Sequence, residues 1–284
     1  MQLPYDIDLE TTLFSGQTFL WKHHEDGYLG CVNGTAAHID STRNLTWDGP
    51  VDETYWRNYF DIDRDYASIA ERYAHDSYVA AAFARYGGMR VLRQPAWETL
   101  CSFVISANNN IGRITSIMTK LSERYGDAIC FRGHTLHAFP SPKQMLQAGE
   151  EGIRACGPGY RAPYLLECAR RMSAGFDMEA IAVAGYENAL KQLMTLPGVG
   201  EKVADCILLF ACGYASAFPV DVWVRRVMRT LYGAEDKNAA IKAEGLRLFG
   251  TDAGLVQQVL FHAARMGLFP ALCKKEPTVC ACGE

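Results

Sequence analysis

The sequence predicts an α+β protein in which a small N-terminal antiparallel β-sheet domain precedes a mainly α-helical domain. The first 60 residues contain short apolar runs separated by turn signals, and Asn33-Gly34 between two such runs is a strong cue for a β-hairpin. From Asp52 onward, apolar residues recur at helical spacing instead. With 284 residues, of which 49% are hydrophobic, the chain can bury a large core in one or two domains.

The N-terminal part is expected to contain four strands and three helices. The strands are expected at residues 17–23, 28–32, 35–40 and 45–47, and the helices at residues 55–60, 66–74 and 77–86. Gly87-Gly88 then interrupts the pattern. We therefore divide the chain into a sheet domain, residues 1–88, and a helical domain, residues 89–284, although the helices before the boundary can pack on either side.

A Pro-Gly-Val-Gly hairpin, residues 197–200, joins two amphipathic helices in the second half of the chain. Gly198 and Gly200 allow positive φ and, with Val199 between them, leave backbone N–H groups uncovered. The following helix adds about half a positive charge at its N-terminus. Gly198, Val199 and Gly200 therefore predict a phosphate-binding hairpin, although an ordinary helix-turn-helix corner also fits these residues.

Three side chains that could take part in catalysis follow this hairpin. Lys202 lies in the first turn of the new helix, where the helix dipole disfavours a cation, and Cys206 is one turn further on the same face. Asp221 stands where a third helix needs its N-cap, a role that alone could explain it.

Together, the segments LPGVGEKVADC, residues 196–206, and FPVDVW, residues 218–223, resemble the helix-hairpin-helix (HhH-GPD) DNA glycosylase superfamily, in the branch with a catalytic lysine. The resemblance implies that Lys202 and Asp221 are the catalytic residues. An amine attacks only when it is neutral, and the helix N-terminus favours loss of the proton. Glu201, Asp205 and Asp221 oppose that loss if they lie close to the amine.

Two further segments resemble the base pocket of 8-oxoguanine DNA glycosylases. FSGQTFLW, residues 14–21, is similar to the segment whose glycine carbonyl reads the damaged base in that family, which corresponds to Gly16. Gln257 and Phe261, spaced i and i+4 on a predicted helix, match the pair that supplies an amide and a stacking ring. Cys206 completes the pocket that the resemblance implies. Core packing is the alternative for Phe261.

Two other segments resemble the parts of that family that enter the DNA helix. The NNNI-x-RI string implies that Asn108 fills the space left by the extruded base and that Arg113 contacts the orphaned partner. In GPGYRA, residues 157–162, Tyr160 and Arg161 match a wedge and a partner-base contact, with Pro158 where the family has a bulky apolar residue. A solvated turn and a Tyr packed under its own loop are the alternatives.

The resemblance implies a bifunctional DNA glycosylase/β-lyase that flips out 8-oxoguanine, preferably opposite cytosine, and excises it through a lysine Schiff base. Its expected partner is double-stranded DNA containing 8-oxoguanine. One alternative is an endonuclease III-like glycosylase for oxidised pyrimidines, against which the N-terminal segment counts. The other is a non-catalytic helix-hairpin-helix DNA-binding module, which leaves Lys202, Cys206 and Asp221 unexplained.

The net charge of −4 argues against a protein that coats nucleic acid non-specifically, so DNA recognition must come from a local basic patch. We expect no cofactor and no metal, because Cys273, Cys280 and Cys282 are one short of the four cysteines of an iron-sulfur cluster. The chain lacks an apolar run long enough for a membrane span. We expect a monomer without a membrane partner, cytoplasmic, or nuclear in a eukaryote.

Overall fold

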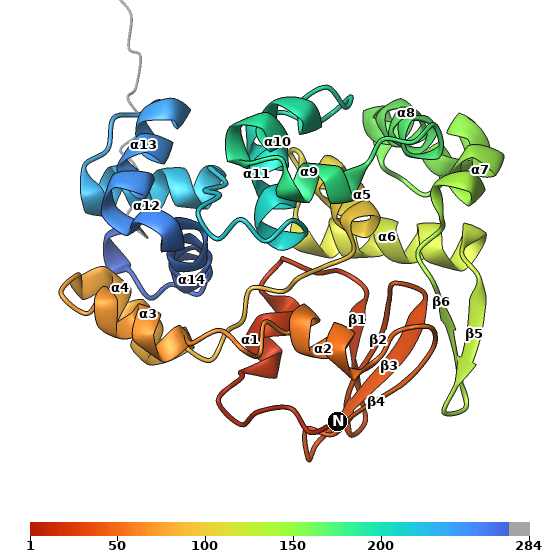
Figure 1. Cartoon of the computed structure of the whole chain (residues 1–284), viewed down its shortest axis with the longest axis horizontal. Helices are drawn as coiled ribbons and strands as arrows, with labels where there is room; N and C mark the ends of the chain where they lie inside the picture. The colour runs from red at the N-terminus through yellow and green to blue at the C-terminus, as the bar shows by residue number, and fades with distance from the viewer. Residues whose placement is uncertain (273–284) are drawn as a thin grey trace, which may run out of the picture.

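The computed structural model describes residues 1–272 and combines a four-stranded antiparallel sheet, a two-stranded hairpin and fourteen α-helices (Figure 1). The sheet is a meander in the order β1-β2-β3-β4. Its strands are β1 Trp21–His24, β2 Gly27–Val32, β3 Thr35–Asp40 and β4 Leu45–Asp48. The α+β fold class is thereby confirmed. Cys273, Cys280 and Cys282, on which the cluster expectation rests, lie outside the described residues.

The Asn-Gly hairpin forms as expected between β2 and β3. Asn33 and Gly34 have φ of 51° and 68°, and Val32 pairs with Thr35 across the turn. Both central residues have positive φ, which matches the right-handed twist of the flanking strands. The Asn33-Gly34 pair is therefore sufficient to specify this turn.

The first strand begins later than expected, at Trp21, so the prediction for residues 17–20 is wrong. The buried Gln17 amide explains the difference: it donates to the carbonyls of Thr12 (2.9 Å) and Arg90 (2.8 Å) and accepts from the N–H of Leu92 (2.8 Å). These bonds hold the segment against distant backbone instead of a neighbouring strand. Helix α1, Leu9–Phe14, was not expected, because six residues are too few for a periodic pattern.

Helix α2, Glu53–Tyr59, covers the sheet and builds a first hydrophobic core. Trp56 and Tyr59 are fully buried there, and the indole of Trp21 donates to the Tyr59 hydroxyl at 2.9 Å. The sheet and this helix therefore form one packed unit.

Helices α3, Tyr66–Arg72, and α4, Ser77–Tyr86, precede residue 88 but belong to the second core. Helix α4 packs on α14, Ala253–Arg265, α3 packs on α4, and the Tyr73 hydroxyl at the end of α3 donates to the Phe249 carbonyl at 2.5 Å. The chain thus enters the helical core before the boundary that the sequence suggests.

The remaining helices surround the second core (Figure 1). They are α5 Ala96–Ser106, α6 Ile111–Tyr125, α7 Pro142–Ala155, α8 Ala162–Ser173, α9 Met178–Val183, α10 Tyr186–Leu193, α11 Glu201–Phe210, α12 Val222–Tyr232 and α13 Asn238–Phe249. In Figure 1, α12–α14 with α3 and α4 lie on one side, α5–α11 on the other, and the sheet below. Within residues 1–272, no helix is long and apolar enough to cross a membrane.

An additional hairpin, which the sequence did not indicate, connects α6 to α7. Its strands are β5 Ala128–Phe131 and β6 His134–His137. Leu136 packs in a small apolar cluster with Leu29 and Cys31 of β2, so the hairpin joins the helical part to the sheet.

Candidate active site

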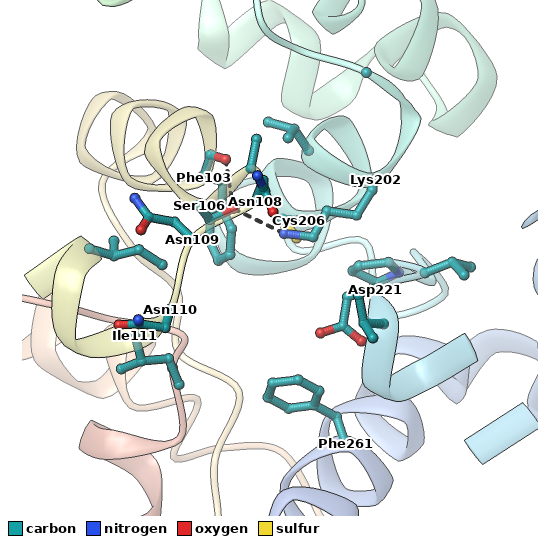
Figure 2. Close-up of a pocket in the computed structure, with 18 of the residues that line it drawn as sticks. Phe103, Ser106, Asn108, Asn109, Asn110, Ile111, Lys202, Cys206, Asp221 and Phe261 are labelled. Carbon is teal, nitrogen blue, oxygen red and sulfur yellow. Dashed lines mark hydrogen bonds between the residues drawn. The ribbon is translucent and has the colours of Figure 1, made fainter. Parts of the chain in front are cut away.

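A cavity of about 930 Å³ lies between the two groups of helices, where the α5–α6 loop, the start of α11, the start of α12 and α14 meet (Figure 2). It brings together ten of the residues that the sequence singled out: Gly16, Asn108, Arg113, Gly198, Gly200, Lys202, Cys206, Asp221, Gln257 and Phe261. In Figure 2, Lys202, Asp221 and Phe261 reach into the same opening from three different elements.

The hairpin before α11 is shaped by its two glycines. Gly198 has φ of 79°, and a Cβ there would lie 2.9 Å from Cδ2 of Tyr164. Gly200 is the N-cap of α11 and offers no side chain, so no side chain caps the first N–H groups of that helix. Val199 is buried and anchors the hairpin in the core. The arrangement leaves backbone donors available to an anion.

Lys202 is half-buried, and its ammonium group faces neutral partners. Nζ donates to Oγ of Ser106 at 3.0 Å and lies 5.2 Å from the centre of the Phe103 ring. The Ser106 hydroxyl in turn donates to the Phe103 carbonyl at 2.7 Å. Over residues 1–272, no carboxylate forms an ion pair with Lys202.

The acidic residues that flank Lys202 in sequence are engaged elsewhere. Lys242 of α13 donates to Glu201 Oε1 at 2.8 Å and to Asp205 Oδ2 at 2.7 Å. Because this pairing lies on another face of α11, the two nearest negative charges in sequence do not hold the Lys202 amine.

Asp221 is the N-cap of α12, as expected, and accepts a hydrogen bond from the N–H of Val224 at 2.8 Å. Burial raises the pKa of this carboxyl, and the charge of Lys202 acts in the opposite direction. The same carboxylate therefore stabilises a helix start and faces the cavity that contains the amine.

The cavity wall combines a thiol, an amide and a ring. Cys206 is 3% exposed, and burial raises the pKa of its thiol to about 12, so it is neutral at pH 7. Gln257 is 4% exposed, and its Oε1 has no hydrogen-bond partner among the described residues. Phe261 lies one turn further along α14. A buried acceptor without a partner is costly, which favours a ligand that donates to it.

Comparison with known proteins gives the same family as the sequence motifs. Residues 2–100 match the family model of the 8-oxoguanine DNA glycosylase N-terminal domain (OGG_N). Residues 101–248 match that of the HhH-GPD superfamily of base excision DNA repair proteins. The chain belongs to this superfamily. The OGG_N match places it in the 8-oxoguanine glycosylase branch, whose members are DNA N-glycosylases with lyase activity.

Individual relatives cover nearly the whole chain. A probable N-glycosylase/DNA lyase of Methanothermobacter thermautotrophicus is 33% identical, over 96% of this chain and 98% of the relative. N-glycosylase/DNA lyase OGG1 of Arabidopsis thaliana is 30% identical, over 91% and 77%. The crystal structure of Clostridium acetobutylicum 8-oxoguanine glycosylase/lyase, in complex with double-stranded DNA containing cytosine opposite 8-oxoguanine, is 33% identical with a TM-score of 0.84, over 93% of each chain.

The three consecutive asparagines of this HhH-GPD protein, residues 108–110, make different contacts. Asn110 caps α6 by accepting from the N–H of Arg113 at 2.9 Å, and Asn109 donates to the Ile105 carbonyl at 3.2 Å. Asn108 is exposed at the tip with φ of 50°. Asn108 is therefore the one of the three whose side chain is free to enter DNA, and the Arg113 side chain is exposed beside it.

Tyr160 and Arg161 lie outside the cavity lining, and Arg161 lies elsewhere than the sequence suggests. Tyr160 is 56% exposed, as a wedge requires. Arg161 is 6% exposed, donates to the carbonyls of Ala107 and, at 3.0 Å, Pro158, and packs 4.2 Å from the Tyr160 ring. Its guanidinium thus ties the Tyr160 loop to the Asn108 segment rather than projecting outward.

Arg265 of this glycosylase lies beside the base pocket and was not expected there from the sequence. Its guanidinium donates to the Ser15 carbonyl at 3.0 Å and lies 5.4 Å from the centre of the Phe261 ring. A Cβ on the neighbouring Gly16, with φ of 92°, would lie 2.5 Å from Ile111 Cδ1. Arg265 follows Gln257 and Phe261 at eight and four residues, so the helical repeat was a usable signal.

Proposed function

We propose that this protein removes 8-oxoguanine from duplex DNA, preferentially opposite cytosine, and that Lys202 forms a Schiff base with the sugar. One observation carries the proposal: Lys202 and Asp221 face a cavity that also contains a ring, Phe261, and an unpartnered amide oxygen, on Gln257. A flipped base needs a pocket of this kind, with a nucleophile at its sugar.

Lys202 is the proposed nucleophile, and the reaction proceeds through attack on the sugar, loss of the base and cleavage of the strand. After loss of a proton, its amine attacks C1′, and the base leaves with the electron pair of the glycosidic bond and takes up a proton. The buried carboxylate of Asp221 stabilises the positive charge that develops on the sugar. Ring opening gives the Schiff base, and removal of a C2′ proton then expels the 3′ phosphate and cuts the strand.

Gly16 and Gln257 are proposed to read the damaged base. 8-Oxoguanine carries hydrogen on N7 and donates to a carbonyl such as that of Gly16, whereas guanine has a lone pair there. The amide oxygen of Gln257 accepts from the donors of the guanine pairing edge. An unmade buried hydrogen bond costs about 1–3 kcal/mol, which is roughly a tenfold to hundredfold preference.

The remaining contacts are proposed for the DNA backbone and the partner strand. The hairpin of Gly198, Val199 and Gly200 seats a phosphate on the uncapped start of α11. Asn108 and Tyr160 fill the gap, and Arg113 contacts the orphaned cytosine, whose O2 and N3 accept hydrogen bonds. The amine, the carboxylate and the base pocket of the proposed site lie together in one chain, and we propose that the protein acts as a monomer.

Borohydride trapping on a duplex with 8-oxoguanine opposite cytosine tests the nucleophile. The wild type should be trapped covalently, Lys202→Gln should not, and Lys191→Gln, which alters an exposed lysine of α10, should behave like the wild type. Trapping that survives in Lys202→Gln would assign the nucleophile to another residue. Absence of trapping in the wild type would favour the non-catalytic DNA-binding module.

Single-turnover excision rates test substrate choice. Excision opposite cytosine should be at least about tenfold faster than opposite adenine, whose amino group faces the Arg113 donors without an acceptor, and Arg113→Ala should narrow the gap. A lesion with CH at position 7 should lose tight binding. Faster excision of an oxidised pyrimidine than of 8-oxoguanine would favour the endonuclease III-like alternative instead.

A further inference from the structure

Three of the seven histidines gather around one carboxylate on the sheet, outside the active-site cavity. His24 ends β1, Asp26 lies in the β1–β2 turn, and His38 comes from β3. His134, at the start of β6, completes the group from the hairpin between α6 and α7. The excision chemistry uses none of these side chains.

Two imidazoles converge on the same carboxylate oxygen. His24 Nδ1 lies 2.9 Å and His38 Nε2 lies 2.8 Å from Oδ1 of Asp26. One ligand atom from each of the three residues lies within 4.8 Å of the others. Zn²⁺ binds imidazole nitrogen and carboxylate oxygen at about 2.0–2.2 Å, so two ligands of one tetrahedral ion stand about 3.3 Å apart. The cluster therefore needs only small movements to hold an ion.

His134 is placed to orient one of these imidazoles. Its Nε2 lies 3.0 Å from Nε2 of His24, and the two rings meet edge to face at 86°. An imidazole that binds a metal through Nδ1 carries its proton on Nε2, and metal-binding histidines usually donate that proton to an acceptor. With its proton on Nδ1, His134 offers Nε2 as such an acceptor.

The surroundings leave room for an ion and a path to it. A pocket of about 300 Å³ is lined by these four residues together with Glu25, Leu29 and Arg132. The His38 side chain is 1% exposed and that of Asp26 49%, so one side of the group is anchored and the other is open to solvent. The one cation in the lining, Arg132, is tied to Thr46 Oγ1 at 3.3 Å.

We propose that His24, Asp26 and His38 bind a divalent transition-metal ion such as Zn²⁺, with His134 as the positioning residue. Two imidazoles and a carboxylate suit this class of ion, whereas Mg²⁺ and Ca²⁺ favour sites made of oxygen. The ion links β1, the β1–β2 turn and β3 and, through His134, connects the β5–β6 hairpin to the sheet. The proposal is independent of the excision chemistry and revises the expectation of no metal. His24, Asp26 and His38 come from neighbouring strands and the turn between them, whereas His134 stands 110 residues after His24.

Titration of the full chain with Co²⁺ tests the site. The wild type should bind one Co²⁺ with visible d–d absorption and no sulfur-to-cobalt charge transfer, because the ligands are nitrogen and oxygen. His24→Ala and Asp26→Asn should each lose the band, and His134→Ala should weaken binding by about tenfold or more. His23→Ala is the matched control, since this neighbouring histidine pairs with Glu10 outside the cluster and its variant should keep the band.

Thermal unfolding provides a second measurement that does not depend on enzymatic activity. A hundredfold excess of Zn²⁺ over its Kd should raise the Tm of the wild type by roughly 5 °C and leave Asp26→Asn unchanged. The proposal is wrong if the wild type shows no Co²⁺ band, if the band persists in both His24→Ala and Asp26→Asn, or if it carries sulfur charge transfer that disappears when Cys273, Cys280 and Cys282 are replaced by serine.

Discussion

Two lysines, one in helix α11 and one in the neighbouring α13, differ in whether carboxylates surround them. Lys242 is buried between two carboxylates, those of Glu201 and Asp205, and lies 5.3 Å from the centre of the Tyr186 ring. Lys202, by contrast, bonds a hydroxyl and faces the cavity. Burial alone would lower the pKa of Lys242, but the charge and hydrogen bond of Asp205 together with the hydrogen bond of Glu201 raise it overall.

The difference shows how one helix keeps a lysine paired with carboxylates apart from the lysine that is proposed to react. Glu201 and Asp205 are four residues apart and share one face of α11, and Lys202 and Cys206 share the next. Because Lys242 occupies the acidic face, the carboxylate near Lys202 that remains is Asp221, which the proposed reaction uses. Lys242 thus pairs with the two acidic side chains that flank Lys202 in sequence.

The largest expected effect is on stability, and it comes from replacing Lys242. Lys242→Met leaves Asp205 buried without its cation and should lower the free energy of unfolding by about 3–5 kcal/mol. Lys202→Met should change it by less than about 1 kcal/mol, because Lys202 has no ion pair to lose. Chemical denaturation at pH 7 measures both. A second variant, Lys242→Met with Asp205→Leu, should recover much of the loss, and equal losses for both single variants would contradict the distinction.

The raised pKa also sets the pH range of this effect. A lysine whose folded-state pKa is raised contributes its full stability below the unfolded value, about 10.4, and loses it as the pH rises through the folded value. The gap between wild type and Lys242→Met should therefore shrink in alkali, where Lys242 loses its proton, and also in acid, where protonation of the buried Asp205 removes the uncompensated charge from the variant.

Asp221→Asn should have the next largest effect, and it tests the proposed catalytic role of the Asp221 charge. Asparagine keeps the cap on α12 but removes the charge, so single-turnover excision should fall by about 10²- to 10³-fold. Burial raises the pKa of Asp221, so ionisation opposes folding, and the wild type loses stability as the pH rises from about 4 through the folded value. The variant should equal or exceed the wild-type Tm at pH 7. A joint loss of Tm and activity would reduce Asp221 to a structural cap.

The sequence was most informative where a feature depends on neighbouring residues. Asn33-Gly34 and the cap at Asp221 are local devices, and each forms as expected. In the hairpin around Val199, Gly198 takes positive φ, whereas Gly200 is extended with φ of −90°. Arg161 and Gln17 could not be placed from sequence, because their partners, such as the Ala107 and Arg90 carbonyls, lie more than fifty residues away. Likewise, the β5–β6 hairpin turns on Arg132 and Gly133, a pair outside the usual turn signals.

Arg265→Met sharpens the comparison by testing the cation that packs on Phe261, a ring of the cavity wall. Loss of the bond to Ser15 and of the packing on Phe261 should loosen the segment that holds Gly16, lowering 8-oxoguanine excision by about tenfold. Cleavage at a preformed abasic site should change little, since no base is read there. Assaying both substrates separates the roles: an equal fall on both would make Arg265 a general electrostatic partner of Asp221 instead.

Ser106→Ala should have the smallest effect, because it removes only the hydrogen bond that orients Lys202, the proposed nucleophile. The Ser106 proton is committed to the Phe103 carbonyl, so its oxygen accepts from Lys202 and does not donate to the amine. The lone pair of the neutral amine is therefore left for C1′. Without this acceptor, Schiff-base formation should slow by up to about tenfold, the equivalent of one ordinary hydrogen bond.

Ser106→Thr keeps the hydroxyl and serves as the matched control for this prediction. It should restore the rate of borohydride-trappable complex formation, with the affinity for lesion DNA unchanged in both variants, since Ser106 acts through Lys202 and not on the base. If alanine weakened DNA binding without slowing the covalent step, Ser106 would shape the cavity rather than position the amine. Lys202 would then depend for its reactivity on separation from Glu201 and Asp205 alone.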